Sequence, residues 1–177
     1  SLAKTLGPLF AEGAAARDAG DVFPADHFDA LKEHKIFSAL VPADRGGGGA
    51  SHGAMCAFLR DLAHYCPATA LALAMHQHLV AASIYHHRNG RPGAKLLERV
   101  AATELVLIST GANDWMESSG TMTRADGGFH VNARKPFGSG SPKGAVLVTS
   151  APFEDAKDGW QVLHFAVPFA APGISLA

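Results

Sequence analysis

The chain has 177 residues, 47% of them hydrophobic and 18% charged, with a formal net charge of -1, so it can bury one sizeable core or two small ones. Near-neutral charge without a basic run argues against a nucleic-acid-binding surface, and no apolar run approaches the roughly 18 residues that cross a bilayer. Because Ser1–Lys4 also lacks the pattern of a signal peptide, we expect a soluble cytoplasmic protein that binds neither nucleic acid nor membrane.

Helical signals fill the chain from its start to about Thr103. Pro24 precedes Phe28 and Leu31, which share one face of a short amphipathic helix. The segment VPADRGGGGAS, Val41 to Ser51, then combines a proline with four successive glycines. Such a composition predicts a flexible loop.

Longer helices follow this loop. Ser51 can cap a helix whose apolar residues recur at helical spacing. After Pro67 the segment ATALALAMHQHLVAASIYHH is apolar nearly all round, which predicts a core helix buried on most sides. Pro92 begins a further helix that carries Leu96 and Leu97.

The cysteines and histidines give no sign of a disulfide or a metal site. Cys56 and Cys66 lie ten residues apart in a helical stretch, and a rise of about 1.5 Å per residue separates them by roughly 15 Å, too far for a disulfide. We expect buried thiols in a reducing compartment. His76 and His78 are the best metal candidates, but helix positions two apart point about 200° from each other and cannot chelate one ion together. We therefore predict ordinary helix histidines and no metal.

From Glu104 onward the periodicity becomes that of strands. The order of helices followed by strands predicts an α+β fold, with a helical domain over residues 1–104 and a β domain over residues 105–177. The expected strand segments are Leu105–Thr110, a hairpin within Thr121–Arg134 around Asp126–Gly128, and Ala145–Ser150 and Gln161–Pro168 on either side of a turn at Asp158–Gly159.

Two stretches resemble the acyl-CoA dehydrogenase superfamily. FPADHFDALKEHKIFSALVPADRGGGGAS is similar to its proline-started helix, short apolar strand and P-x-x-x-G-G loop. TRADGGFHVNARKPF is similar to its T-x-A…dG-x-x-x-x-n-G-x-K-x-W segment, with Ala133 for a glycine and Phe137 for the tryptophan. The resemblance covers essentially the whole chain. It implies an α-helical N-terminal domain followed by an antiparallel β-barrel middle domain, complete or in part.

The resemblance also implies that the family's helical C-terminal domain is absent from this sequence. The catalytic carboxylate of the family lies in that domain, so the catalytic residue remains unknown. We therefore expect a fragment or one half of a split protein, and activity from these 177 residues alone is doubtful.

The family's cofactor is a flavin, which implies FAD here, with FMN as the alternative. A flavin needs a flat wall and a hydrogen-bond partner near its reactive nitrogen. The resemblance assigns these roles to Phe137, Gly138 and Ser139: the ring as wall, the glycine for close approach, and the hydroxyl toward the flavin. From the residues alone, an aromatic at a strand end followed by an ordinary turn is the favoured explanation of the segment, and the resemblance reverses this preference.

A second family segment, T-E-P-G-A-G-S-D, aligns with Thr110–Glu117. The Thr110 hydroxyl is kept, and with the strand backbone at Leu107 and Ser109 it is implied to bind the pyrimidine edge of the flavin. Met116 replaces the serine that helps to bind phosphate-bearing ligands, which weakens the case for acyl-CoA as substrate. Trp115 and Met116 then either face the substrate or pack a loop against the barrel.

The segment Phe137–Gly140, F-x-S-G, also resembles the motif of flavin-dependent monooxygenases that share this fold. Those enzymes place a histidine on the buried helix near the flavin, and His76 lies in the corresponding stretch. A neutral imidazole there could stabilise an oxygen adduct of the flavin by hydrogen bonding, which makes His76 a candidate substrate-site residue. The alternative is a core histidine bonded to a backbone carbonyl.

Three interpretations of function follow. The first is a flavin-dependent oxidoreductase of acyl-CoA dehydrogenase type, which carries out α,β-dehydrogenation of an acyl thioester. The second is a two-component flavin-dependent monooxygenase of the same fold. The third is a catalytically incomplete subunit. The expected partners are a small-molecule substrate, with acyl-CoA as one candidate, and further copies of the chain or a complementing subunit.

Overall fold

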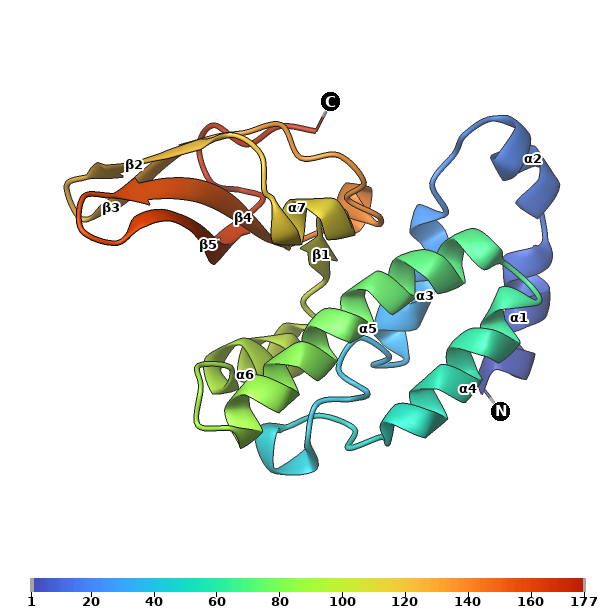
Figure 1. Ribbon diagram of the computed structural model, residues 1–177. Helices are drawn as coiled ribbons and strands as arrows, with labels where there is room; N and C mark the ends of the chain where they lie inside the picture. The colour runs from blue at the N-terminus through green and yellow to red at the C-terminus, as the bar shows by residue number, and fades with distance from the viewer. Residues whose placement is uncertain (1, 177) are drawn as a thin grey trace.

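The computed structural model describes residues 2–176 and shows a helical part followed by a sheet part, which confirms the predicted α+β order (Figure 1). None of the helices among these residues is long and apolar enough to cross a membrane. The elements are α1 (Leu2–Ala11), α2 (Ala14–Ala19), α3 (Ala25–Glu33), η1 (Ala43–Arg45), α4 (His52–Ala63), α5 (Pro67–Arg88), α6 (Ala94–Thr103), β1 (Leu107–Ser109), α7 (Ala112–Met116), β2 (Thr121–Ala125), β3 (Gly128–Asn132), η2 (Ser141–Lys143), β4 (Val146–Asp155) and β5 (Gly159–Pro168).

Helix α5 is the centre of the helical part, and α4, α6 and β1 pack against it. Its buried side chains include the apolar Leu73 and Val80 and the polar His76. The two largest apolar clusters extend into β1, since Ile108 belongs to one and Leu107 to the other. The short strand β1 is therefore part of the helical core as well as of the sheet.

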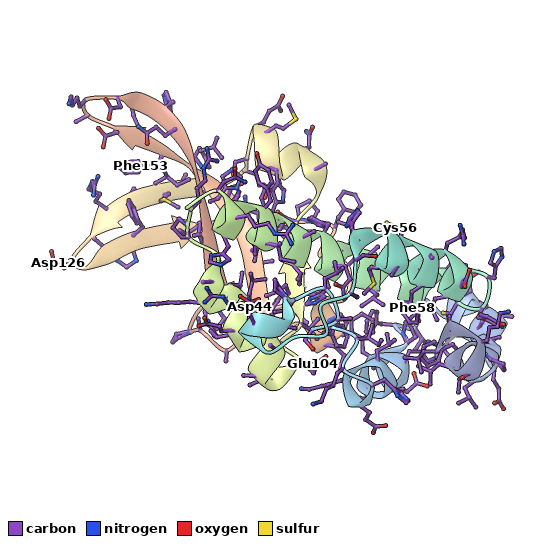
Figure 2. All side chains as sticks on the ribbon, turned by 90° about the horizontal axis from the view of Figure 1, so that it is seen from below. Asp44, Cys56, Phe58, Glu104, Asp126 and Phe153 are labelled. Carbon is purple, nitrogen blue, oxygen red and sulfur yellow. The ribbon has the colours of Figure 1, made fainter. Side chains whose placement is uncertain are left out.

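The cysteines lie in different surroundings. Cys66, before α5, is buried as predicted. Cys56 is exposed, so the prediction of a buried thiol was wrong for this residue. Figure 2 shows Cys56 and Phe58 on α4, away from Phe153 on β4 and from Asp126 in the turn between β2 and β3. Cys56 directly follows the buried Met55, so it lies off the buried stripe of an amphipathic helix.

The sheet differs from the expected antiparallel barrel in two respects. It is open among the described residues, with the strand order β1-β4-β2-β3 and β5 paired to β4. It is also mixed, because β1 and β2 pair with β4 in parallel whereas the β2–β3 and β4–β5 hairpins are antiparallel. The two hairpins diverge toward their tips (Figure 2). The ten-residue β4 pairs with β1 through its first residues and with β2 near its end. The β2–β3 hairpin therefore contacts β4 only near the end of that strand.

The glycine-rich loop after Val41 is packed rather than free. The N–H groups of Gly48 and Gly49 donate to the carbonyls of Ser38 and Val41. Gly47 lies so close to Val41 that a Cβ there would overlap it. Several glycines of this loop therefore allow close backbone approach, which revises the expectation of a simply flexible loop.

Candidate functional site

Apart from His76 on α5, the predicted site residues come from two segments that meet where β1 leaves the helical core. The first runs from β1 into α7, and the second is the loop from Phe137 to Gly144. Gly111 and Phe137 are in contact, because a Cβ built on Gly111 would lie 3.4 Å from Cδ2 of Phe137. The fold thus brings the Thr110 segment and the Phe137 segment side by side, as a shared site requires.

Phe137 is the most unusual residue of this junction. Its side chain is 81% exposed and its φ is 62°. A bulky residue in the left-handed region is strained, and such strain persists where surrounding structure enforces it, often at ligand sites. Phe137 thus combines an exposed ring with a strained backbone.

The glycines that follow Phe137 let this loop lie directly on Ile108. A Cβ on Gly138 or Gly140 would approach Ile108 side-chain atoms to 3.4 and 3.3 Å, and one on Gly144 would come within 2.5 Å of Ile108 Cγ1. A Cβ would be in ordinary contact at Gly138 and in tight contact at Gly140, whereas at Gly144 it would overlap Ile108, so Gly144 is the position where a side chain would prevent this packing. Close packing on Ile108 therefore accounts for Gly144, and the left-handed φ of 87° accounts for Gly140.

A buried polar network fixes the segment after β1, and it centres on Asp114. Oδ2 of Asp114 accepts hydrogen bonds from the hydroxyls of Thr110 at 2.7 Å and Thr149 at 3.1 Å. Oδ1 accepts from Nζ of Lys135 at 2.6 Å and from the N–H of Ser119 at 3.1 Å. The network therefore ties α7 to β4 and to the segment after β3.

The charge of Asp114 is stabilised by this network. Burial alone would raise the pKa of the carboxyl, but the hydrogen bonds from Lys135, Thr110 and Ser119 outweigh burial and hold the pKa below its ordinary value. Asp114 and Lys135 are 7% and 8% exposed.

Sequence reasoning missed this buried ion pair. Its signal was an acidic residue four positions after Thr110 in a short helix.

His76 lies in the core, and main-chain groups bond both of its ring nitrogens. Nε2 donates to the carbonyl of Phe37 at 2.9 Å, and Nδ1 accepts from the N–H of Leu107 at 2.9 Å. Burial lowers the pKa of His76 to about 4, so the ring is neutral near pH 7. This geometry favours the core-histidine interpretation, because no ring nitrogen is free for a ligand. His76 instead joins α5 to β1.

Trp115 and Met116, neighbours on α7, differ in how exposed their side chains are. Trp115 is half-buried and packs against His164 with ring centroids 4.9 Å apart. Met116 is 80% exposed. The packing interpretation thus describes Trp115, whereas only the Met116 side chain is open to a ligand in this arrangement.

The predicted flavin contacts differ in whether their hydrogen-bonding groups already have partners within the protein. The Leu107 N–H is bonded to His76 and the Thr110 hydroxyl to Asp114, so neither is free as a donor. Within residues 2–176, Ser109 Oγ is buried without a hydrogen-bond partner, a rare condition that an added polar group would relieve. Of these predicted contacts the Phe137 ring is exposed, whereas Ser109 is fully buried.

Two hollows lie away from this junction. One of about 500 Å³ opens between β2 and β4 and is lined by Met122, Phe153 and Trp160 among others. Another of about 580 Å³ lies beside the start of α5 and is lined by Arg17, Phe23 and Cys66 among others. Neither contains a predicted site residue.

Residues 6–104 match the acyl-CoA dehydrogenase N-terminal domain family. The chain is 26% identical over 184 residues to the "Probable FMNH2-dependent monooxygenase SfnC" of Pseudomonas putida, covering 99% of this chain and 43% of that protein. It is 24% identical over 187 residues to the mitochondrial isovaleryl-CoA dehydrogenase of Oryza sativa subsp. japonica, covering 100% of this chain and 45% of that protein. The chain thus spans less than half the length of these relatives.

A solved structure shows the same fold. Methanesulfinate monooxygenase MsuC from Pseudomonas fluorescens superposes with a TM-score of 0.85 at 22% identity, over 97% of this chain and 43% of that protein. The open sheet and the helical part therefore correspond to one section of a larger fold.

Proposed function

The chain belongs to the acyl-CoA dehydrogenase family, and from that premise we propose that it is part of a flavin-dependent monooxygenase. The observation that carries the proposal is the Phe137–Gly140 loop. Phe137, with an exposed ring and a strained backbone, begins the F-x-S-G pattern that resembles the monooxygenases of this fold. The similarity to SfnC supports this interpretation at least as well as dehydrogenation, which the sequence alone favoured.

The proposed cofactor is FMN, in agreement with the FMNH2 dependence of the similar protein SfnC, and FAD is the alternative. When bound and reduced, the flavin would supply the electrons that activate oxygen. The reduced flavin would come from a separate reductase. A small-molecule substrate would bind on the exposed side of the junction, where Met116 is accessible.

Two residues of this chain would position the cofactor. The Phe137 ring would form a wall against the flavin face, and the Ser139 hydroxyl would donate a hydrogen bond to it. The Asp114 network would act indirectly, because it fixes the segment that holds Gly111 against Phe137.

Dehydrogenation of an acyl thioester is the second candidate. The 24% identity to isovaleryl-CoA dehydrogenase favours it. Met116 stands against it, because a thioether replaces the serine hydroxyl of the family segment and cannot donate a hydrogen bond to a phosphate.

The oxidation state of the flavin discriminates between the two. The intact protein, loaded with oxidised flavin, is mixed with a series of acyl-CoA thioesters without oxygen, and its visible absorbance is recorded. We expect the flavin to remain oxidised with every thioester. In a second experiment the flavin is reduced beforehand and mixed with oxygen, and we expect the protein to change the rate at which the oxidised spectrum returns. Bleaching by any thioester would establish the dehydrogenase instead.

A further inference from the structure

The loop that carries Phe137 is attached to the helical part through an ion pair. Nζ of Lys143 donates to both carboxylate oxygens of Asp29, at 2.7 and 2.8 Å. Lys143 lies in η2 and Asp29 in α3. Within residues 2–176 this is the single ion pair that joins the helical part to the sheet part.

Consecutive turns connect Lys143 to Phe137. The N–H of Lys143 donates to the Gly140 carbonyl, that of Ser141 to Gly138, and that of Ser139 to Phe137, each at 3.0 Å. These bonds make the segment one compact unit rather than a free loop. A displacement of η2 is therefore transmitted toward the Phe137 backbone.

Helix α3 touches the same loop at a second point. A Cβ on Gly140 would lie 3.5 Å from the Phe28 ring, so Phe28 and Asp29 face the loop from adjacent positions. Phe28 supplies apolar contact, which does not depend on one orientation. The ion pair supplies direction, because both carboxylate oxygens accept from the same ammonium group.

We propose that Lys143 and Asp29 are positioning residues, which clamp the Phe137–Ser139 loop onto α3 and so set its conformation for the flavin. This inference rests on the proposed flavin site. Side-chain exposures of 33% for Lys143 and 60% for Asp29 mean that the pair contributes little to global stability. Its effect is local, on the loop.

The test combines charge reversal with restoration. Lys143→Asp, Asp29→Lys and the double exchange are made in the intact protein, and the FMN dissociation constant is measured by flavin fluorescence. Each single reversal should weaken FMN binding by about two- to fivefold, the range of an exposed ion pair. The double exchange should restore it. High salt should reduce the difference, because it screens exposed charges.

Glu98→Lys is the matched control. Glu98 pairs with Arg45 at 2.7 Å with side-chain exposures of 50% and 30%, but that pair lies within the helical part. Its reversal should leave FMN binding unchanged. Amide hydrogen exchange of Gly138–Gly144 without flavin gives an independent measure: it should be faster in the two single variants and normal in the double exchange.

The outcomes separate the two proposals. If the wild type binds FMN and the single reversals bind it equally well, the clamp is refuted and the flavin site stands. If the wild type binds neither FMN nor FAD, the flavin site fails and the proposed positioning role fails with it. Exchange rates in the loop that ignore the reversals would refute the clamp whatever the flavin result.

Discussion

His76 illustrates what a sequence can and cannot say about a polar residue in a core helix. The sequence predicted that His76 lies on an apolar helix, and it left two alternatives, a ring that faces a ligand and a ring buried in the core. The choice between them depends on partners 39 and 31 residues away, the carbonyl of Phe37 and the N–H of Leu107. No local pattern encodes these distant main-chain contacts.

The depressed pKa of His76 predicts a pH dependence of stability. Between pH 6.5 and about 4, His76 is protonated in the unfolded protein but stays neutral in the folded protein. The free energy of unfolding therefore falls with decreasing pH across this window, and His76 contributes about 3 kcal/mol to the fall. In His76→Gln this contribution should vanish, as measured by urea unfolding at several pH values. His86→Gln, an exposed change on the same helix, should keep it; an unaltered pH slope in His76→Gln would contradict the assignment.

The Asp114–Lys135 pair makes a second prediction at this scale. Lys135→Met leaves a buried carboxylate without its counter-charge, so it should lower the free energy of unfolding at pH 7 by about 3 kcal/mol. Because the folded pKa of Asp114 is depressed, its contribution is present above the unfolded value of 3.8 and is lost as pH falls below it. Denaturant unfolding at pH 7 and pH 3 measures both effects.

Arg60→Met is the control for that change. Its ion pair with Asp61 is 3.7 Å long and Arg60 is 73% exposed, so the loss should be below about 1 kcal/mol. Equal losses from Lys135→Met and Arg60→Met would show that the Asp114 network contributes little.

At the scale of elements, the glycines before β4 were visible in the sequence, which assigned Gly138 to close approach of a flavin, but their packing on Ile108 was not. A run of Gly and Ser is compatible with an ordinary turn. The structure shows the loop pressed onto Ile108, a residue about thirty positions earlier on another strand. Turn chemistry is local and could be predicted, whereas the contact surface beneath the turn could not.

Gly144→Ala tests this packing. The added Cβ would lie 2.5 Å from Ile108 Cγ1 and 2.7 Å from Phe169 Cε2. Overpacking of this kind should destabilise the protein by about 1–3 kcal/mol. Gly128→Ala is the matched control, since nothing lies within 4 Å of its Cβ position. Thermal or denaturant unfolding of both variants decides the matter, and equal stabilities would mean that the loop does not pack as described.

For the whole molecule, the order of helices and strands was predictable because each element's period is written in its own residues. The arrangement of the sheet was not. Parallel pairing of β1 and β2 with β4 joins segments far apart in the chain, and alternation of side chains says nothing about which strands meet. The division at Glu104 stays a prediction, and the packing of β1 in the helical core shows how closely the two parts are joined.

The central claim is that the Phe137 loop forms one wall of a flavin site. The most direct measurement is a titration of the intact protein and of Phe137→Ala with FMN, followed by flavin fluorescence, with Phe129→Ala as an aromatic control on β3. We predict saturable binding by the wild type and by Phe129→Ala, and binding about tenfold weaker by Phe137→Ala, the order expected for one lost aromatic contact. Binding that is equally tight in Phe137→Ala, or absent in the wild type, would contradict the account.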